Sequence, residues 1–135
     1  MKKQITFAIT ALFILTGLVS CQKDDGNQVV KGLAGQWKVS KIETTVAGAA
    51  TVTYTGIDTD YFEFRRNEED ELYISLNTNS YTGNYVALEG KLLNFTYNGK
   101  LRKAKITTLT DNNFEFSATV EGETVATTEK YYLTR

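Results

Sequence analysis

The sequence predicts an all-β protein whose antiparallel strands form an up-and-down meander and close into a small eight-stranded barrel. Three observations favour this fold. Short runs with apolar residues at alternate positions recur from residue 35 onward, turn-forming residues separate them, and no segment there has a sustained helical period. Alternation with a period of two places one face of each strand in a core and the other in solvent.

The clearest alternation is in residues 113–121, where Phe114, Phe116 and Ala118 are separated by polar residues. Segments 71–77 and 91–97 follow the same pattern. Segment 50–56 can also be interpreted as an extension of segment 36–46, so the sequence predicts eight or nine strands. The expected strands are residues 36–46, 50–56, 60–66, 71–77, 80–88, 91–97, 100–109, 113–121 and 124–134.

The turns between these segments depend on Asn, Asp and Gly, because the chain has no proline. Asn98-Gly99, between two alternating segments, is the strongest hairpin signal, since both turn positions need a positive φ. A meander has an unpaired edge at each end, and closure into a barrel removes both. A two-sheet sandwich is the alternative, but sandwiches usually need long crossing loops. The short connections favour the barrel.

The first 20 residues are expected to be a signal peptide. Lys2 and Lys3 precede the uncharged, largely apolar stretch 5–19, which is the order of a secretory signal. A membrane-spanning helix needs about 20 apolar residues, and this stretch is shorter, so an uncleaved anchor is the less favoured alternative. Cleavage would remove two lysines and no acidic residue, which makes the mature chain more acidic than the formal net charge of −1.

Leu18-Val19-Ser20-Cys21 resembles the lipobox of bacterial lipoproteins. The resemblance implies cleavage before Cys21 and a diacylglyceryl group on its sulfur, with acyl chains such as palmitate that hold the protein on a membrane. Cys21 is the only cysteine, so an internal disulfide is excluded. An ordinary signal peptide followed by an incidental free thiol is the alternative.

Residues 21–32 are expected to be the lipidated cysteine and a flexible tether, because residues 22–28 are polar and turn-forming. Lys23-Asp24-Asp25 also resembles the short export tag of some outer-membrane lipoproteins, which implies display at the cell surface. We therefore expect an outer-membrane lipoprotein of the cell envelope, on either the periplasmic face or the surface. No cluster of positive charge marks a nucleic-acid partner or a polybasic membrane patch.

Residues 33–135 are expected to form the barrel domain, and they resemble bacterial lipocalin-like lipoprotein domains. In that family a tryptophan plugs one barrel end and an arginine from the last strand packs over it, which implies these roles for Trp37 and Arg135. A core tryptophan with a frayed terminal arginine is the alternative. Residues 47–56 make a longer first loop than the family usually has. The matching motifs are Gly35-Gln36-Trp37, Phe62-Glu63-Phe64, Gly83-Asn84-Tyr85, Ile106-Thr107-Thr108-Leu109, Phe114-Glu115-Phe116 and Tyr131-Tyr132-Leu133-Thr134-Arg135.

The sequence favours a protein that is not an enzyme and needs no cofactor or metal. It has no histidine, and its one cysteine is assigned to the lipid, so the commonest general base, thiol nucleophile and soft metal ligands are missing. Acidic residues gather at 58–60 and 68–71, in expected turns where carboxylates are simply solvated. A weak calcium site there is the alternative.

Two functions stay open. In the first, the barrel binds a small hydrophobic or amphiphilic molecule, with ring side chains lining the cavity. The alternative for each ring is that it only fills the core. In the second, a filled barrel docks another envelope protein or a glycan through exposed tyrosines such as Tyr54, Tyr73 or Tyr132. The residues proposed to line a cavity are Phe64, Tyr85, Phe95 and Phe116.

Overall fold

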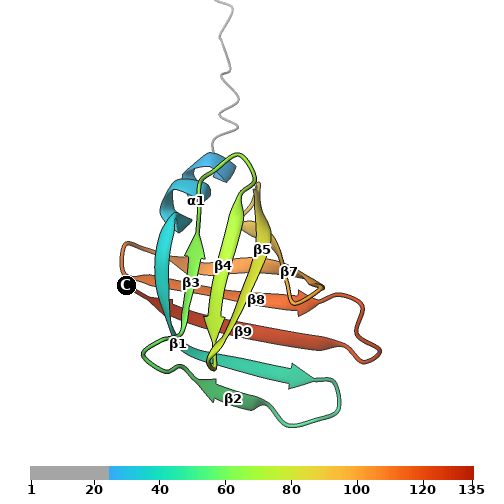
Figure 1. The fold of residues 1–135 in the computed structure, drawn as a ribbon. Helices are drawn as coiled ribbons and strands as arrows, with labels where there is room; N and C mark the ends of the chain where they lie inside the picture. Colours follow the sequence, from blue (N-terminus) through green and yellow to red (C-terminus); the bar gives the residue numbers. More distant parts are fainter. Residues whose placement is uncertain (1–24) are drawn as a thin grey trace, which may run out of the picture.

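The computed structural model describes residues 25–135 and consists of one helix followed by nine strands (Figure 1). The predictions for residues 1–20, including the signal peptide, and for Cys21 lie outside this range. Within it, no helix is long and apolar enough to cross a membrane. The elements are α1 (Asp25–Leu33), β1 (Gly35–Val46), β2 (Val52–Thr55), β3 (Tyr61–Phe64), β4 (Glu71–Leu76), β5 (Asn79–Leu88), β6 (Leu92–Tyr97), β7 (Lys100–Leu109), β8 (Asn113–Val120) and β9 (Thr127–Thr134).

The strands form a closed antiparallel barrel, which confirms the predicted fold class. From β3 to β9 each strand pairs with the next in the chain. The barrel closes where β9 returns to β1, in a register that runs from Lys38↔Thr134 to Val46↔Thr127. Closure leaves the first and last long strands without free edges.

The second strand is not an extension of the first. β2 pairs with the C-terminal half of β1, with Ile42 opposite Tyr54, and β3 pairs with the N-terminal half, with Trp37 opposite Phe62. One edge of β1 pairs with β9. The other edge pairs with both β2 and β3, which therefore occupy a single position in the barrel, so the nine strands fill eight positions. Gly56 lies at the break between them, where a Cβ atom would lie 1.9 Å from the Val39 carbonyl oxygen.

The Asn98-Gly99 turn has the predicted geometry, with φ values of 51° and 70°. Tyr97 and Lys100 pair on either side of it. This confirms the hairpin predicted from the dipeptide, since a two-residue turn with positive φ at both positions matches the twist of the flanking strands.

The middle of the barrel is filled with aromatic side chains. The Phe116 ring stacks on Tyr131 with centroids 4.6 Å apart, and Phe114 lies 4.7 Å from Phe116. Burial of each such ring contributes about 1.5–3 kcal/mol to folding, so the rings stabilise the barrel strongly. The aromatic side chains that are at most 1% exposed are Trp37, Phe62, Phe64, Tyr85, Phe95, Phe114, Phe116 and Tyr131.

The expectation of a flexible tether is wrong for residues 25–32, which form most of α1. Val29 and Leu33 are four positions apart and therefore share one face of the helix. Leu33 is completely buried and Val29 packs against the core. Gly35, with φ of 108°, ends the helix and turns the chain into β1. Only two apolar residues carry this packing, so the polar composition of the segment concealed the helix.

Candidate ligand-binding site

The end of the barrel beside α1 is closed by Trp37 and Arg135. The indole Nε1 of Trp37 donates a hydrogen bond of 2.8 Å to the Leu33 carbonyl. Arg135 Cζ lies 3.8 Å from the centroid of the Trp37 ring, and its Nη2 donates to the carbonyls of Ala34 and Leu33. These contacts join the end of the helix to the start of the first strand and to the residue that follows the last strand. This end is a structural plug.

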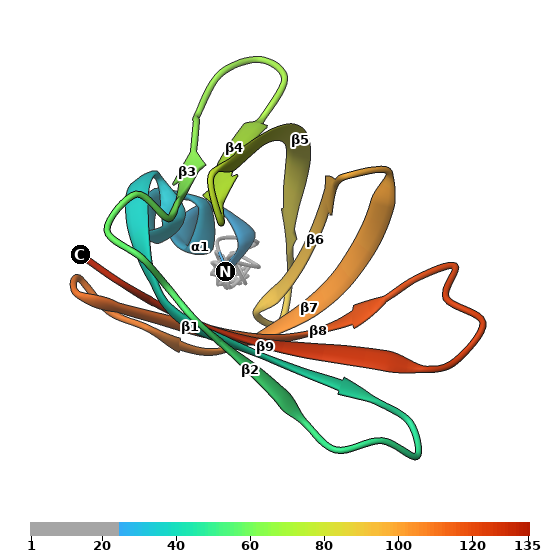
Figure 2. The ribbon, with the colours of Figure 1, turned by 60° about the horizontal axis from the view of Figure 1, so that its bottom comes forward.

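A cavity of about 330 Å³ opens at the other end of the barrel. Its lining residues come from β1, β2, β7 and β9 and from the hairpins that join β4 to β5 and β6 to β7. Figure 1 has α1 at the top, and Figure 2 brings the opposite side forward. We call this space the mouth cavity; it is lined by Ile42, Thr44, Tyr54, Leu76, Asn77, Asn79, Tyr81, Tyr97, Asn98, Arg102 and Glu129.

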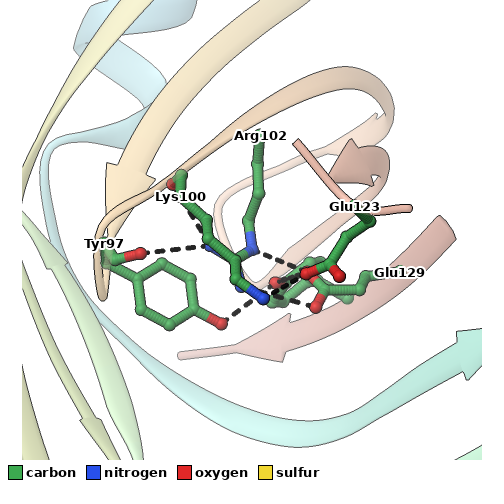
Figure 3. A network of polar contacts seen from close by, with 6 residues as sticks. Tyr97, Lys100, Arg102, Glu123 and Glu129 are labelled. Atoms are coloured by element: carbon green, nitrogen blue, oxygen red, sulfur yellow. Dashed lines mark hydrogen bonds and ion pairs between the residues drawn. The ribbon is translucent and has the colours of Figure 1, made fainter. Parts of the chain in front are cut away.

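An ion pair between Arg102 and Glu129 forms part of the cavity wall (Figure 3). Arg102 Nε lies 2.7 Å from Glu129 Oε2, and the side chains are only 7% and 13% exposed. Arg102 Nη1 donates to the carbonyls of Tyr97 and Lys100, at 3.3 and 3.4 Å. The guanidinium also stacks on the Tyr97 ring, 3.8 Å from its centroid. These contacts hold the charge in one orientation.

Two buried tyrosine hydroxyls extend this network below the cavity. Tyr131 donates a hydrogen bond to Glu129, and the hydroxyls of Tyr97 and Tyr131 lie 3.3 Å apart. Burial raises the pKa of Tyr131 well above its usual value near 10, and burial also raises the pKa of Tyr97. Both hydroxyls therefore stay protonated at neutral pH. The network carries one positive and one negative charge, which balance.

Asp60 holds the segments at the rim of the mouth cavity together through hydrogen bonds. It is completely buried, although we expected acids in this segment to be solvated. Its carboxylate accepts hydrogen bonds from the Tyr54 hydroxyl, from the Ile57 amide at 3.0 Å and from the Asn77 amide at 2.9 Å. These partners come from β2, the β2–β3 connection and the β4–β5 turn, so one side chain joins three segments. Nothing in the local sequence distinguished it from Asp58.

The residues that we expected to line a cavity lie instead in the filled core. The Phe64 and Tyr85 rings are in contact, with centroids 5.1 Å apart, and Phe95 packs on Phe116 at 5.6 Å. None of the four lines the mouth cavity. Alternation along a strand identified their inward face correctly, but it carries no information about their depth along the barrel axis. The rings that do line the cavity are Tyr54, Tyr81 and Tyr97.

The tyrosines considered for an external docking surface are each partly covered. Arg65 stacks on Tyr73 with 3.8 Å between Cζ and the ring centroid, and Lys41 Nζ lies 4.2 Å above Tyr132. Tyr54 is half-buried in the wall of the mouth cavity. Among the residues described, no three acidic side chains come together in a way that could hold a metal ion.

A closed antiparallel barrel with a tryptophan plug at one end and a cavity at the other defines a barrel of the lipocalin kind. The sequence model of the lipocalin-like domain family matches residues 33–116. The match covers more than half of the chain, and the protein belongs to the lipocalin-like domain family. No curated protein matches the sequence. Among solved structures, a redesigned β-barrel is similar with a TM-score of 0.47 and 14% identity, over 78% of this chain and 93% of that chain.

Proposed function

We propose that this protein is a non-catalytic lipoprotein of the bacterial outer membrane that binds a small amphiphilic molecule at the mouth of its barrel. The observation that carries the binding function is the mouth cavity of about 330 Å³. Small-molecule sites have volumes from about 300 Å³ upward and combine apolar walls with a few oriented polar groups. Ile42 and Leu76 supply apolar wall here, and Arg102 supplies an oriented polar group.

The ligand binds at the rim instead of the barrel centre. Phe62 and Tyr131, immediately inside the Tyr97 ring, are buried and in edge contact with each other at 5.6 Å. A long acyl chain therefore has no channel to enter, and the cavity suits a short or compact molecule. The lipocalin-like fold is generally non-catalytic, and we propose the same for this chain.

The lipid anchor is proposed from the lipobox-like residues that end at Cys21. α1 begins at Asp25 and contacts β5 and β7 at the plugged end. An extended residue spans at most about 3.6 Å, so the anchor holds the plugged end within roughly 15 Å of the bilayer surface. The mouth cavity then opens away from the membrane, toward ligands in the aqueous phase.

Anchoring is tested by metabolic labelling with an alkyne analogue of palmitate in a bacterial host that lipidates such proteins. We expect label in the membrane fraction for the wild-type chain and neither label nor membrane association for Cys21→Ala. Protease added to intact cells then separates surface display from the periplasmic face. Membrane association of unlabelled Cys21→Ala would contradict the lipid anchor.

Binding is tested with octyl glucoside below its micelle concentration, followed by NMR on residues 22–135, which contain the whole barrel and α1. We expect amide shifts that saturate and that concentrate at residues of the mouth cavity such as Tyr81 and Asn98. Tyr81→Ala should weaken this binding. Tyr73→Ala, on the outer face of the neighbouring strand β4, should not. Shifts confined to the outer surface would contradict a binding site at the mouth.

A docking module is the second candidate, because part of the outer surface is apolar. Val86, Leu88 and Leu92 are 53%, 39% and 42% exposed, and Leu88 pairs directly with Leu92 across β5 and β6. Contiguous exposed apolar residues are typical of protein contacts. In-cell crosslinking tests this candidate: a specific crosslinked envelope protein should disappear in a Leu88→Ser, Leu92→Ser double variant that still binds octyl glucoside.

A further inference from the structure

We propose that the mouth cavity is specific for a neutral sugar ring, supplied either by a free saccharide or by the headgroup of a glycosylated amphiphile. This inference rests on the proposed function, namely that the mouth cavity binds a small molecule. It adds the chemical class of the group that is recognised, and three properties of the lining residues carry it: charge, hydrogen-bonding capacity and shape.

The charge of the lining selects against ions. Arg102 and Glu129 are the two charged residues of the lining, and they neutralise each other at 2.7 Å. Nearby, Lys100 and Glu123 are also paired with each other (Figure 3). A bound carboxylate or phosphate would compete with Glu129 for the guanidinium, and an ammonium group would compete with Arg102. Either exchange leaves one of these largely buried charges without its partner, which is costly.

The hydrogen-bonding groups of the lining match hydroxyls. The amide side chains of Asn77 and Asn98 make no hydrogen bond within the part of the chain whose side chains are described, and each offers a donor and an acceptor. Arg102 uses four of its five N–H groups on Glu129 and two carbonyls, which leaves one Nη2–H for a ligand oxygen. A hydroxyl also donates and accepts, whereas a carboxylate only accepts and an ammonium only donates.

The shape of the cavity suits a compact ring with one apolar face. Tyr81 and Tyr97 stand at the cavity with ring centroids 5.6 Å apart and planes inclined by 58°. Ile42 and Leu76 extend this apolar wall. A sugar ring carries its C–H groups on its faces and its hydroxyls at its edge, so it can pack on tyrosine while its edge reaches the asparagines. A volume of about 330 Å³ accommodates one or two such rings.

The test is an NMR titration of residues 22–135 with six probes. Maltose and N-acetylglucosamine are neutral sugars, glucuronate and glucosamine are charged sugars, octanol is apolar, and octyl glucoside joins a sugar to a chain. We expect octyl glucoside to shift the mouth residues, accompanied by the neutral sugars if the site takes a free saccharide, and the charged sugars to bind about tenfold more weakly than the neutral probes. Equal affinity for maltose and octyl glucoside identifies a free saccharide, and binding of octyl glucoside without octanol or maltose identifies a sugar headgroup.

A matched pair of variants separates the site from general destabilisation. Asn98→Gly removes one amide while glycine retains the positive φ of that turn, so we expect about tenfold weaker sugar binding. Asn112→Gly, in the exposed turn between β7 and β8, should bind sugar unchanged. If only octanol or a charged probe binds at the mouth, the sugar inference is overturned and the proposed function stands. If no probe binds, both are overturned.

Discussion

Arg135 and Trp37, from the last residue of the chain and the start of the first strand, lie with the guanidinium 3.8 Å above the indole ring. The same guanidinium donates to the carbonyls of Leu33 and Ala34 at the end of α1. One exposed side chain therefore connects the helix, β1 and β9 at the point where the barrel closes. The family resemblance implied this pairing, and the contacts with α1 explain what it does.

Arg135→Ala should lower the free energy of unfolding by about 1–2 kcal/mol, since it removes a cation–π contact and two hydrogen bonds to carbonyls. Arg135→Lys should lie between the wild type and Arg135→Ala, because an ammonium can donate to the carbonyls but has no planar group to stack on the indole ring. Urea unfolding followed by tryptophan fluorescence measures both. Lys130→Ala, at an exposed position of the strand that precedes Arg135, is the control. Equal stability of Arg135→Ala and this control would contradict the role.

Asp60→Asn should destabilise the fold by about 1–3 kcal/mol. The carboxylate accepts three hydrogen bonds in a fully buried place, and an amide can accept fewer and adds donors that find no acceptor. Asp58→Asn is the matched control, since it makes the same chemical change at an exposed position of the same segment. Thermal unfolding should separate the two variants clearly. Two identical melting curves would show that the rim of the mouth cavity does not depend on Asp60.

Gly83→Ala should cost about 3 kcal/mol of stability. A Cβ atom at this position would lie 1.6 Å from the Thr96 carbonyl oxygen, so β5 and β6 would have to separate. Gly83 also lies next to the point where β5 changes partner, since Asn84 pairs both with Glu71 of β4 and with Thr96 of β6. Thr82→Ala, on the exposed face beside it, should stay within about 0.5 kcal/mol of the wild type. Chemical unfolding of both chains measures the difference.

Stability should fall when the pH rises above about 10. Burial raises the pKa of Tyr131 well above its value in the unfolded chain. Below pH 10 both states keep the phenol proton, so the contribution of Tyr131 is fully present. Above it, the unfolded chain loses the proton while the folded chain retains it, which favours unfolding. Urea midpoints from pH 8 to 11 should decline less steeply for Tyr131→Phe, and parallel declines would contradict the assignment.

Much of the barrel could be predicted because its determinants are local. Alternation showed which side chains of residues 113–121 face inward, and Asn98-Gly99 marked a hairpin through the backbone angles that these two residues accept. The mouth cavity could not be predicted in this way. Its walls combine Ile42, Tyr81 and Glu129, which are distant in sequence. The spacing of strands in the sequence does not give the stagger of register between strands, which places these residues at the same level along the barrel axis.

For this protein the sequence alone determined the fold class, the strand order and the inward faces, because these depend on the period of the pleat and on turn chemistry. Only the tertiary structure decided how far the rings fill the barrel, that α1 covers one end, and that Asp60 and the Arg102–Glu129 pair are buried. Each of these depends on which side chains meet across strands. The core is filled, and its buried polar groups find hydrogen-bond partners, only when the whole barrel is closed.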